Sequence, residues 1–191
     1  MHITNWKKEI FTIPNMLSVF RILLIPVYVW LYLEAERIEE YHTAALVLAV
    51  SCLTDMIDGK IARKFNMISR VGKVLDPLAD KLTQLALLLC LTTRYRGLRT
   101  MLVLFLIKEF WQLFAMIAAM RRGKALNGAL WSGKVSTTVL FTSLGLMFLF
   151  PNMSDWTANG LALVCLGFLL YAFGDYAMAY LGKNKKIYDL E

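Results

Sequence analysis

Two charged stretches interrupt the apolar first half of this chain: DMIDGKIAR at residues 55–63 and, eight residues further on, GKVLDPLAD at residues 72–80. The runs that flank them, Ala44–Leu53 and Leu82–Leu91, are mostly apolar and ten residues long. A helix that crosses a bilayer needs about 20 residues. Each run therefore completes a crossing only if the charged stretch beside it is helical too. This places the aspartates on helices, toward one end of the bundle.

The aspartates of the two stretches lie on helix faces that can meet. At about 100° per residue, Asp55 and Asp58 fall within an arc of about 100° on the first helix. Gly72, Asp76 and Asp80 are spaced four residues apart and drift by about 80° around the second helix. We therefore expect four carboxylates between the two helices.

Four carboxylates at membrane depth need a counter-charge. Each ionised aspartate costs about 2.5–3.5 kcal/mol on insertion scales, and four together also repel one another. One interpretation is purely structural, with salt bridges to the cations of the same segments, which are Lys60, Arg63, Lys73 and Lys81. The other interpretation is that the carboxylates bind metal ions.

The donor set indicates which metal is expected. All the donors are oxygens, because no cysteine or histidine is expected close by: His2 is terminal, and His42 opens its segment at the opposite end. Oxygen donors select hard cations, so Mg²⁺ or Mn²⁺ is favoured over Zn²⁺. Two such ions would clamp a diphosphate, and Arg63, one turn past the acids, can pair with phosphate.

The composition is that of an integral membrane protein. Of the 191 residues, 58% are hydrophobic, which exceeds the share in a soluble domain. The net charge is +7, and the basic residues cluster beside apolar runs. Membrane lipid with anionic headgroups is therefore the expected partner, and nucleic acid is not. The first thirteen residues are polar and mixed, which predicts that no signal peptide is removed.

Six segments are long and apolar enough, with their charged ends, to cross a membrane. They are Pro14–Leu33, Tyr41–Lys64, Val71–Thr93, Leu98–Met120, Trp131–Phe150 and Trp156–Leu181. The expected fold class is therefore all-α: an integral membrane bundle of six transmembrane helices that forms a single domain, residues 1–191.

The lysines and arginines beside these segments predict an orientation. One side of the membrane receives Lys7, Lys8, Lys64, Arg70, Lys73, Arg121, Arg122, Lys124, Lys183, Lys185 and Lys186. The other side receives Arg37, Arg94, Arg96 and Arg99. The richer side is expected to be cytoplasmic, so both termini and the carboxylates are expected at the cytoplasmic face of the cytoplasmic membrane.

Together the two stretches read Asp-x2-Asp-Gly-x2-Ala-Arg-x8-Gly-x3-Asp-x3-Asp, with all eight fixed positions present. This pattern resembles the signature of the CDP-alcohol phosphatidyltransferases, and the six-helix layout is similar to that family as well. The resemblance implies that Asp55, Asp58 and Asp76 ligate a pair of Mg²⁺ or Mn²⁺ ions. It also implies that Asp80 is both a ligand and the general base.

The resemblance further implies a reaction and its partners. CDP-diacylglycerol gives its phosphatidyl group to a polar alcohol, Asp80 takes the proton of the acceptor hydroxyl, and CMP leaves. A homodimer is expected. The positions implied to contact the CDP part of the donor are Gly59, Arg63 and Ser69 and, on the first helix, Asn15, Ser18 and Arg21. For the first-helix positions, the start of the helix and contact with headgroups remain the structural alternative.

Within the family, LDPLADK at residues 75–81 and the opening Pro14-Asn15 are similar to phosphatidylglycerophosphate synthases, which use glycerol 3-phosphate. Cardiolipin synthases of the eukaryotic type share both features and use phosphatidylglycerol. Lys108 and Lys134 are the candidate acceptor-binding residues, because their charges lie within apolar helices. Lys108 stands where the first group often has arginine, so an ion pair with Glu109 that only holds the structure together stays open.

Two other classes of protein are possible. A transporter that uses the acids as a relay is favoured by inverted repeats and broken helices, and the sequence shows no repeat. A non-catalytic membrane scaffold that keeps a metal for stability does not need the complete signature, including the base at Asp80.

Overall fold

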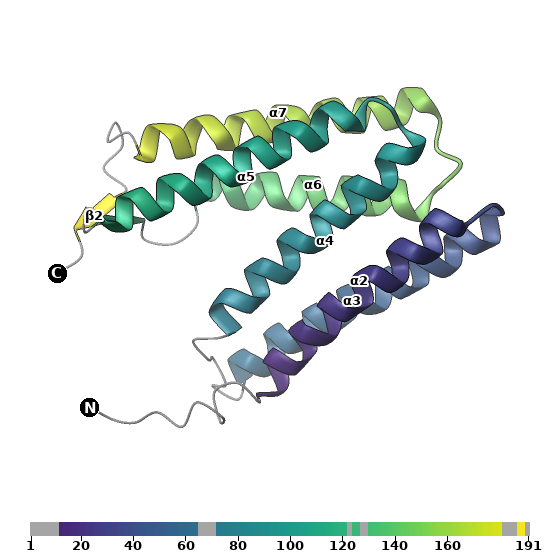
Figure 1. The fold of residues 1–191 in the computed structure, drawn as a ribbon, viewed down its shortest axis with the longest axis horizontal. Coiled ribbons are helices and arrows are strands. Elements are labelled where there is room, and N and C mark those ends of the chain that lie inside the picture. The colour runs from purple at the N-terminus through teal and green to yellow at the C-terminus, as the bar shows by residue number, and fades with distance from the viewer. Residues whose placement is uncertain (1–11, 65–71, 122–123, 127–129, 181–186, 190–191) are drawn as a thin grey trace. The chain divides into compact units, whose positions relative to one another are not determined.

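The computed structural model describes residues 12–64, 72–121, 124–126, 130–180 and 187–189. In these ranges lie six helices and two short strands (Figure 1). The helices are α2 (Ile13–Glu34), α3 (Ile38–Lys64), α4 (Gly72–Arg94), α5 (Leu98–Arg121), α6 (Trp131–Leu149) and α7 (Asp155–Tyr180). All six expected helices are confirmed, and no end differs from its expected position by more than three residues.

The strands β1 (Lys124–Leu126) and β2 (Ile187–Asp189) pair in the antiparallel direction, with Ala125 opposite Tyr188. They were not expected, because an all-α fold was predicted. The pairing joins the segment after α5 to the segment after α7. The chain divides into two compact units, Met1–Cys90 and Leu91–Glu191, which are described separately below.

In the first unit, α2 and α3 lie side by side along their lengths (Figure 1). The turn between them is closed by Glu40, whose carboxylate accepts hydrogen bonds from the backbone N–H groups of Glu36 (2.7 Å) and Arg37 (3.1 Å). The rings of Tyr32 and Tyr41 meet edge to face, 5.0 Å apart. This end of the helix pair is therefore held by a carboxylate cap and an aromatic contact.

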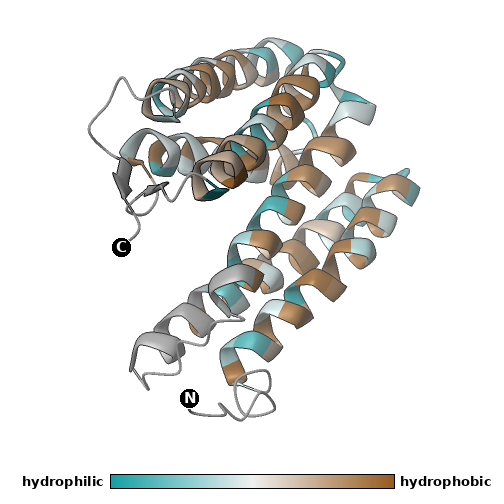
Figure 2. Ribbon diagram, turned by 60° about the vertical axis from the view of Figure 1, so that its left-hand side comes forward, coloured by the Kyte–Doolittle hydropathy of each residue, from teal (hydrophilic) through white to brown (hydrophobic). Residues whose placement is uncertain are grey.

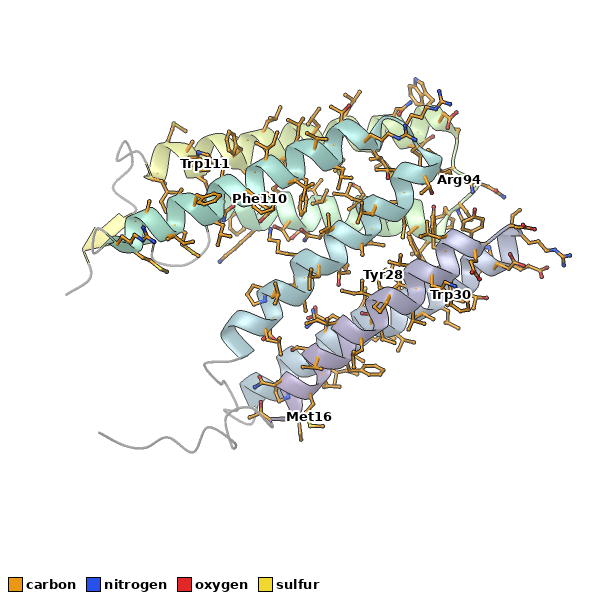
Figure 3. All side chains as sticks on the ribbon, viewed as in Figure 1. Met16, Tyr28, Trp30, Arg94, Phe110 and Trp111 are labelled. Atoms are coloured by element: carbon orange, nitrogen blue, oxygen red, sulfur yellow. The ribbon has the colours of Figure 1, made fainter. Side chains whose placement is uncertain are left out.

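Helix α2 has its polar residues inside and its apolar residues outside. Asn15, Ser18 and Arg21 are at most 3% exposed, although all three are polar. Apart from Glu34 at its end, the exposed large side chains of this helix are apolar, and two of them, Met16 and Trp30, are labelled in Figure 3. This arrangement suits a helix with lipid on its outer face, since exposed apolar surface of this extent is unusual in a soluble monomer.

In the second unit, α7 packs against both α5 and α6 (Figure 1). Small residues line the packed faces of α6 and α7, among them Ser132, Gly133, Ser136, Ser143, Ala158, Cys165, Ala172 and Ala179. Small side chains let membrane helices approach closely. Toward the end of α5, Trp111 (labelled in Figure 3) meets the rings of Phe173 and Tyr180 edge to face at 5.0 and 6.2 Å.

Four helices of the described ranges, α2, α5, α6 and α7, are long and apolar enough to cross a membrane. Figure 2 shows the apolar residues along these helices. Helices α3 and α4 are similarly long but are not apolar enough to be counted with them, because both carry the charged stretches. Of the six crossings expected, four are thus supported by length and composition.

Gly133 offers a test of the packing between α6 and α7. A Cβ atom placed there would lie 2.6 Å from the hydroxyl of Tyr176 and 2.8 Å from its ring, far inside van der Waals contact. We expect Gly133→Ala to lower the free energy of unfolding by about 1–3 kcal/mol, as overpacking does.

Gly145 in the same helix is the matched control, because no atom lies within 4 Å of a Cβ placed there. Gly145→Ala is expected to be neutral or to stabilise by about 0.5–1 kcal/mol, as alanine does in a helix. Thermal unfolding in detergent measures both variants. Equal melting temperatures for the two would contradict the close contact with Tyr176.

Candidate active site

In the first unit, two polar side chains lie on the inner face of α2. Ser18 and Arg21 are three residues apart and therefore point in similar directions from the helix. Ser18 is fully buried, and only 3% of Arg21 is exposed. Both stand on a helix that is apolar enough to cross a membrane, where an unpaired charge is unfavourable.

These side chains meet the aspartates of α3 and α4. Ser18 Oγ donates a hydrogen bond to Asp76 Oδ1 at 2.5 Å. Arg21 Nη1 donates to Asp80 Oδ1 at 2.6 Å and forms an ion pair with Asp55 Oδ1. Three of the four expected carboxylates are thus held by one short segment of α2. The prediction that the faces of the two acidic helices meet is confirmed for Asp55 and Asp80, which share one guanidinium nitrogen.

Arg21 is a partner of Asp55 and Asp80 that the structural interpretation did not name. That interpretation assigned the acids to Lys60, Arg63, Lys73 and Lys81, and it stays untested because the structure does not describe the side chains of the first three. The signal for Arg21 was its position as the lone basic residue of an otherwise apolar helix, Ile13–Glu34. A charge in such a place needs a partner, although the sequence alone does not say which acid it is.

Several residues implied by the signature have side chains that the structure does not describe. Asp58, Gly59 and Arg63 lie on the last two turns of α3, and only their helical backbone is described. Ser69 falls in 65–71, outside the described ranges. Asn15 is described and is 3% exposed on the inner face of α2. The CDP-binding roles of these residues stay predictions.

No cysteine was expected near the acids, yet Cys52 stands three residues before Asp55 on α3. A single helical turn separates Cys52 from Asp55, so the apolar run that holds the thiol continues directly into the site. Cys52 does not make the cluster a zinc site, because one thiol among carboxylates is not a thiolate site.

The acids offer oxygen donors, which are the kind that hard divalent cations prefer. Carboxylates from α3 and α4 already meet on one positive charge, and their oxygens are the donors that Mg²⁺ and Mn²⁺ prefer. Within the described side chains, no three His, Cys, Asp or Glu residues are grouped closely enough to hold a metal ion. Asp58, the fourth acid of the signature, is not among those side chains.

A second polar cluster lies in the second unit. Lys108 Nζ contacts Glu109 Oε1 at 2.8 Å and stands 5.8 Å from the ring centroid of Tyr176, within the range of a cation–π interaction. The side chain of Lys108 is only 8% exposed. The ion pair that was left open is therefore present. Lys134, the other candidate, is exposed on α6.

Two residues of helix α7, Asp175 and Tyr176, make polar contacts that were not expected. Asp175 Oδ2 accepts a hydrogen bond of 2.6 Å from Ser132 Oγ, and the hydroxyl of Tyr176 accepts one of 3.2 Å from the backbone N–H of Leu130. Both contacts hold the start of α6 against α7. An isolated aspartate in the apolar segment 156–181 was the available signal for Asp175.

Comparison with known proteins gives the family. The model of the CDP-alcohol phosphatidyltransferase family matches residues 11–171. A cardiolipin synthase (CMP-forming) of Streptomyces coelicolor is 37% identical over 154 residues, which cover 79% of this chain and 71% of that protein. A CDP-diacylglycerol–glycerol-3-phosphate 3-phosphatidyltransferase of Escherichia coli K12 is 32% identical over 151 residues, which cover 75% and 80%.

The chain therefore belongs to the CDP-alcohol phosphatidyltransferase family and is an enzyme of that family. Its four apolar helices agree with the membrane location of such an enzyme. The resemblance drawn from the signature alone is confirmed over most of the chain.

The Lys108–Glu109 pair can be tested by its effect on stability. Lys108→Met leaves the Glu109 carboxylate without its ammonium partner, so the free energy of unfolding is expected to fall by about 1–3 kcal/mol. Adding Glu109→Gln removes the orphaned charge and should recover most of that loss. Thermal unfolding of both single variants and the double variant measures the coupling. Strictly additive losses would show that the two side chains do not depend on each other.

Proposed function

We propose that this chain transfers the phosphatidyl group of CDP-diacylglycerol to glycerol 3-phosphate, releasing CMP and forming phosphatidylglycerophosphate. The observation that carries the proposal is the convergence of Asp55, Asp76 and Asp80 on one segment of α2, in a chain of this family. The name of the Escherichia coli relative states this donor and this acceptor.

The proposed reaction is a direct displacement at phosphorus. Asp80 takes the proton of the acceptor hydroxyl, and the acceptor oxygen attacks the β-phosphorus of the donor. The new phosphorus–oxygen bond replaces the bond to CMP, which leaves with the electron pair on its phosphate oxygen. Asp80 suits the role of base because its carboxylate is about half exposed, at 47%, so a hydroxyl can reach it within hydrogen-bond distance.

Four carboxylates would hold the metal ions in this proposal: Asp55, Asp58, Asp76 and Asp80. Two bound Mg²⁺ or Mn²⁺ ions would neutralise the diphosphate and stabilise the attacking and leaving oxygens. The proposed CDP contacts are Asn15, Ser18, Gly59, Arg63 and Ser69. Besides its proposed contact with CDP, Ser18 donates a hydrogen bond to Asp76.

Phosphatidylglycerol is the second candidate acceptor, and two observations favour it. The Streptomyces coelicolor relative, named a cardiolipin synthase, is more identical to this chain than the Escherichia coli relative. In addition, the charge of Lys108 is offset by Glu109 at 2.8 Å, which weakens its attraction for a free phosphate. In the first candidate function, Lys108 and Lys134 bind the phosphate of glycerol 3-phosphate.

The proposal also includes a placement in the membrane. Helix α3 has 27 residues and α4 has 23, so they extend over about 40 and 35 Å, more than the roughly 30 Å of the hydrocarbon core. We propose that both cross together with the four apolar helices. In this proposal both termini and the active site lie on the cytoplasmic side, which the excess of lysine and arginine favours. A homodimer is part of the same proposal.

Asp80→Asn tests the base. The amide keeps the size of the carboxylate but cannot accept the proton, so the rate of CMP release should fall by about 10²–10⁴. The measurement is CMP release by purified protein with CDP-diacylglycerol, Mg²⁺ and acceptor, alongside thermal unfolding of the same sample. A folded variant with unchanged turnover would remove Asp80 from the reaction.

The acceptor is identified by the same assay with one acceptor at a time. CMP release is expected with glycerol 3-phosphate, and in that case the double variant Lys108→Met/Glu109→Gln should raise KM for glycerol 3-phosphate about tenfold. Release with phosphatidylglycerol alone would assign the second function instead. A folded protein that releases no CMP with either acceptor would contradict the transferase and favour a non-enzymatic role such as transport.

A further inference from the structure

The guanidinium of Arg21 contacts two of the aspartates that would hold the metal ions in the proposed function. It is 3% exposed and stands on a helix apolar enough to cross a membrane. Its Nη1 atom contacts oxygens from two different helices, Asp55 Oδ1 on α3 and Asp80 Oδ1 on α4. Both aspartates belong to the acids that would hold the divalent ions in the proposed function.

These contacts conflict with metal binding. A carboxylate oxygen that bonds to a guanidinium is less available to a divalent cation, and two positive charges at one carboxylate repel each other. Without any cation, however, Asp55 and Asp80 would face each other as two negative charges, and like charges in contact are unfavourable. Asp55 and Asp80 therefore need a positive partner with or without metal, and they cannot bind Arg21 and a metal ion equally well at the same time.

We propose that Arg21 is the counter-ion of Asp55 and Asp80 when no metal is bound. It holds the carboxylates of α3 and α4 together and releases them when divalent ions bind. Arg21 is then a positioning residue, because it acts through Asp55 and Asp80. This inference rests on the metal site of the proposed function. It adds a competition between a side chain of the protein and the metal for the same oxygens.

The competition has a thermodynamic consequence. If the Arg21 contacts stabilise only the metal-free protein, a variant without them loses stability in the metal-free state and little in the loaded state. By linkage, the same variant must bind the metal more tightly than the wild type. If Arg21 only fastened α2 to α3 and α4, its loss would weaken the protein equally with and without metal.

The experiment compares Arg21→Gln with the wild type. Thermal unfolding is measured in detergent with EDTA and with saturating Mn²⁺, and Mn²⁺ binding is measured directly from the free-ion signal in electron paramagnetic resonance. We expect a lower melting temperature for Arg21→Gln in EDTA, a much smaller difference in Mn²⁺, and an Mn²⁺ affinity raised about fivefold or more. Neither readout depends on catalytic activity.

Two variants complete the comparison. Tyr32→Phe is the matched control, because Tyr32 is buried on the same helix but is not among the partners of the acids; any change in its melting temperature should be equal in EDTA and Mn²⁺. Arg21→Lys keeps the charge on a single nitrogen and should shift both quantities in the same direction as Arg21→Gln, by less. It provides the test by itself if Arg21→Gln does not fold.

An equal loss of stability in both conditions, or weaker Mn²⁺ binding by the Arg21 variants, would overturn the inference while leaving the metal site intact. A wild type that releases CMP but shows no response to Mn²⁺ or Mg²⁺ would overturn both the metal site and the inference. A wild type that binds Mn²⁺ but releases no CMP would refute the transferase alone, because the competition at Asp55 and Asp80 could still be measured.

Discussion

The organisation of the first unit depends on a positive charge held inside an apolar helix. Arg21 is nearly fully buried on α2, and in a low-dielectric environment such a charge is tolerated only beside opposite charges. Asp55 and Asp80 meet that requirement from two other helices. The contacts of one guanidinium thus join α2 to α3 and α4, and they bring Asp55 and Asp80 of the family signature together.

In the second unit too, charged side chains on apolar helices lie beside a polar group or an opposite charge. On its apolar helices Lys108 is paired with its neighbour Glu109, and Asp175 of α7 is paired with Ser132 of α6. None of these polar groups is left facing lipid alone. The Ser132–Asp175 hydrogen bond joins α6 to α7, and Lys108 of α5 lies near the ring of Tyr176 on α7. The polar contacts therefore lie where the helices pack, and Tyr176 also fills the space beside Gly133.

The helices and their acidic faces could be predicted from the sequence because both depend on spacing along one chain segment. The partner of Arg21 could not, since it depends on how α2 packs against segments far away in the sequence. The closeness of Cys52 to Asp55, by contrast, is local, because the two residues are three positions apart on α3. The strand pair β1–β2 gave no signal, because three residues are too few for a periodic pattern. The acid pattern nevertheless led to the correct family, since its residues are local.

The polar inner face and apolar outer face of α2 have a consequence for how the protein is made. Arg21 enters the membrane on the first apolar helix of the described chain, whereas its partner Asp80 is synthesised 59 residues later. During that interval the arginine has no Asp80 to bond. Until α3 and α4 have been made, Arg21 lacks the carboxylates of Asp55 and Asp80, so α2 alone is a less favourable membrane helix than its apolar residues suggest.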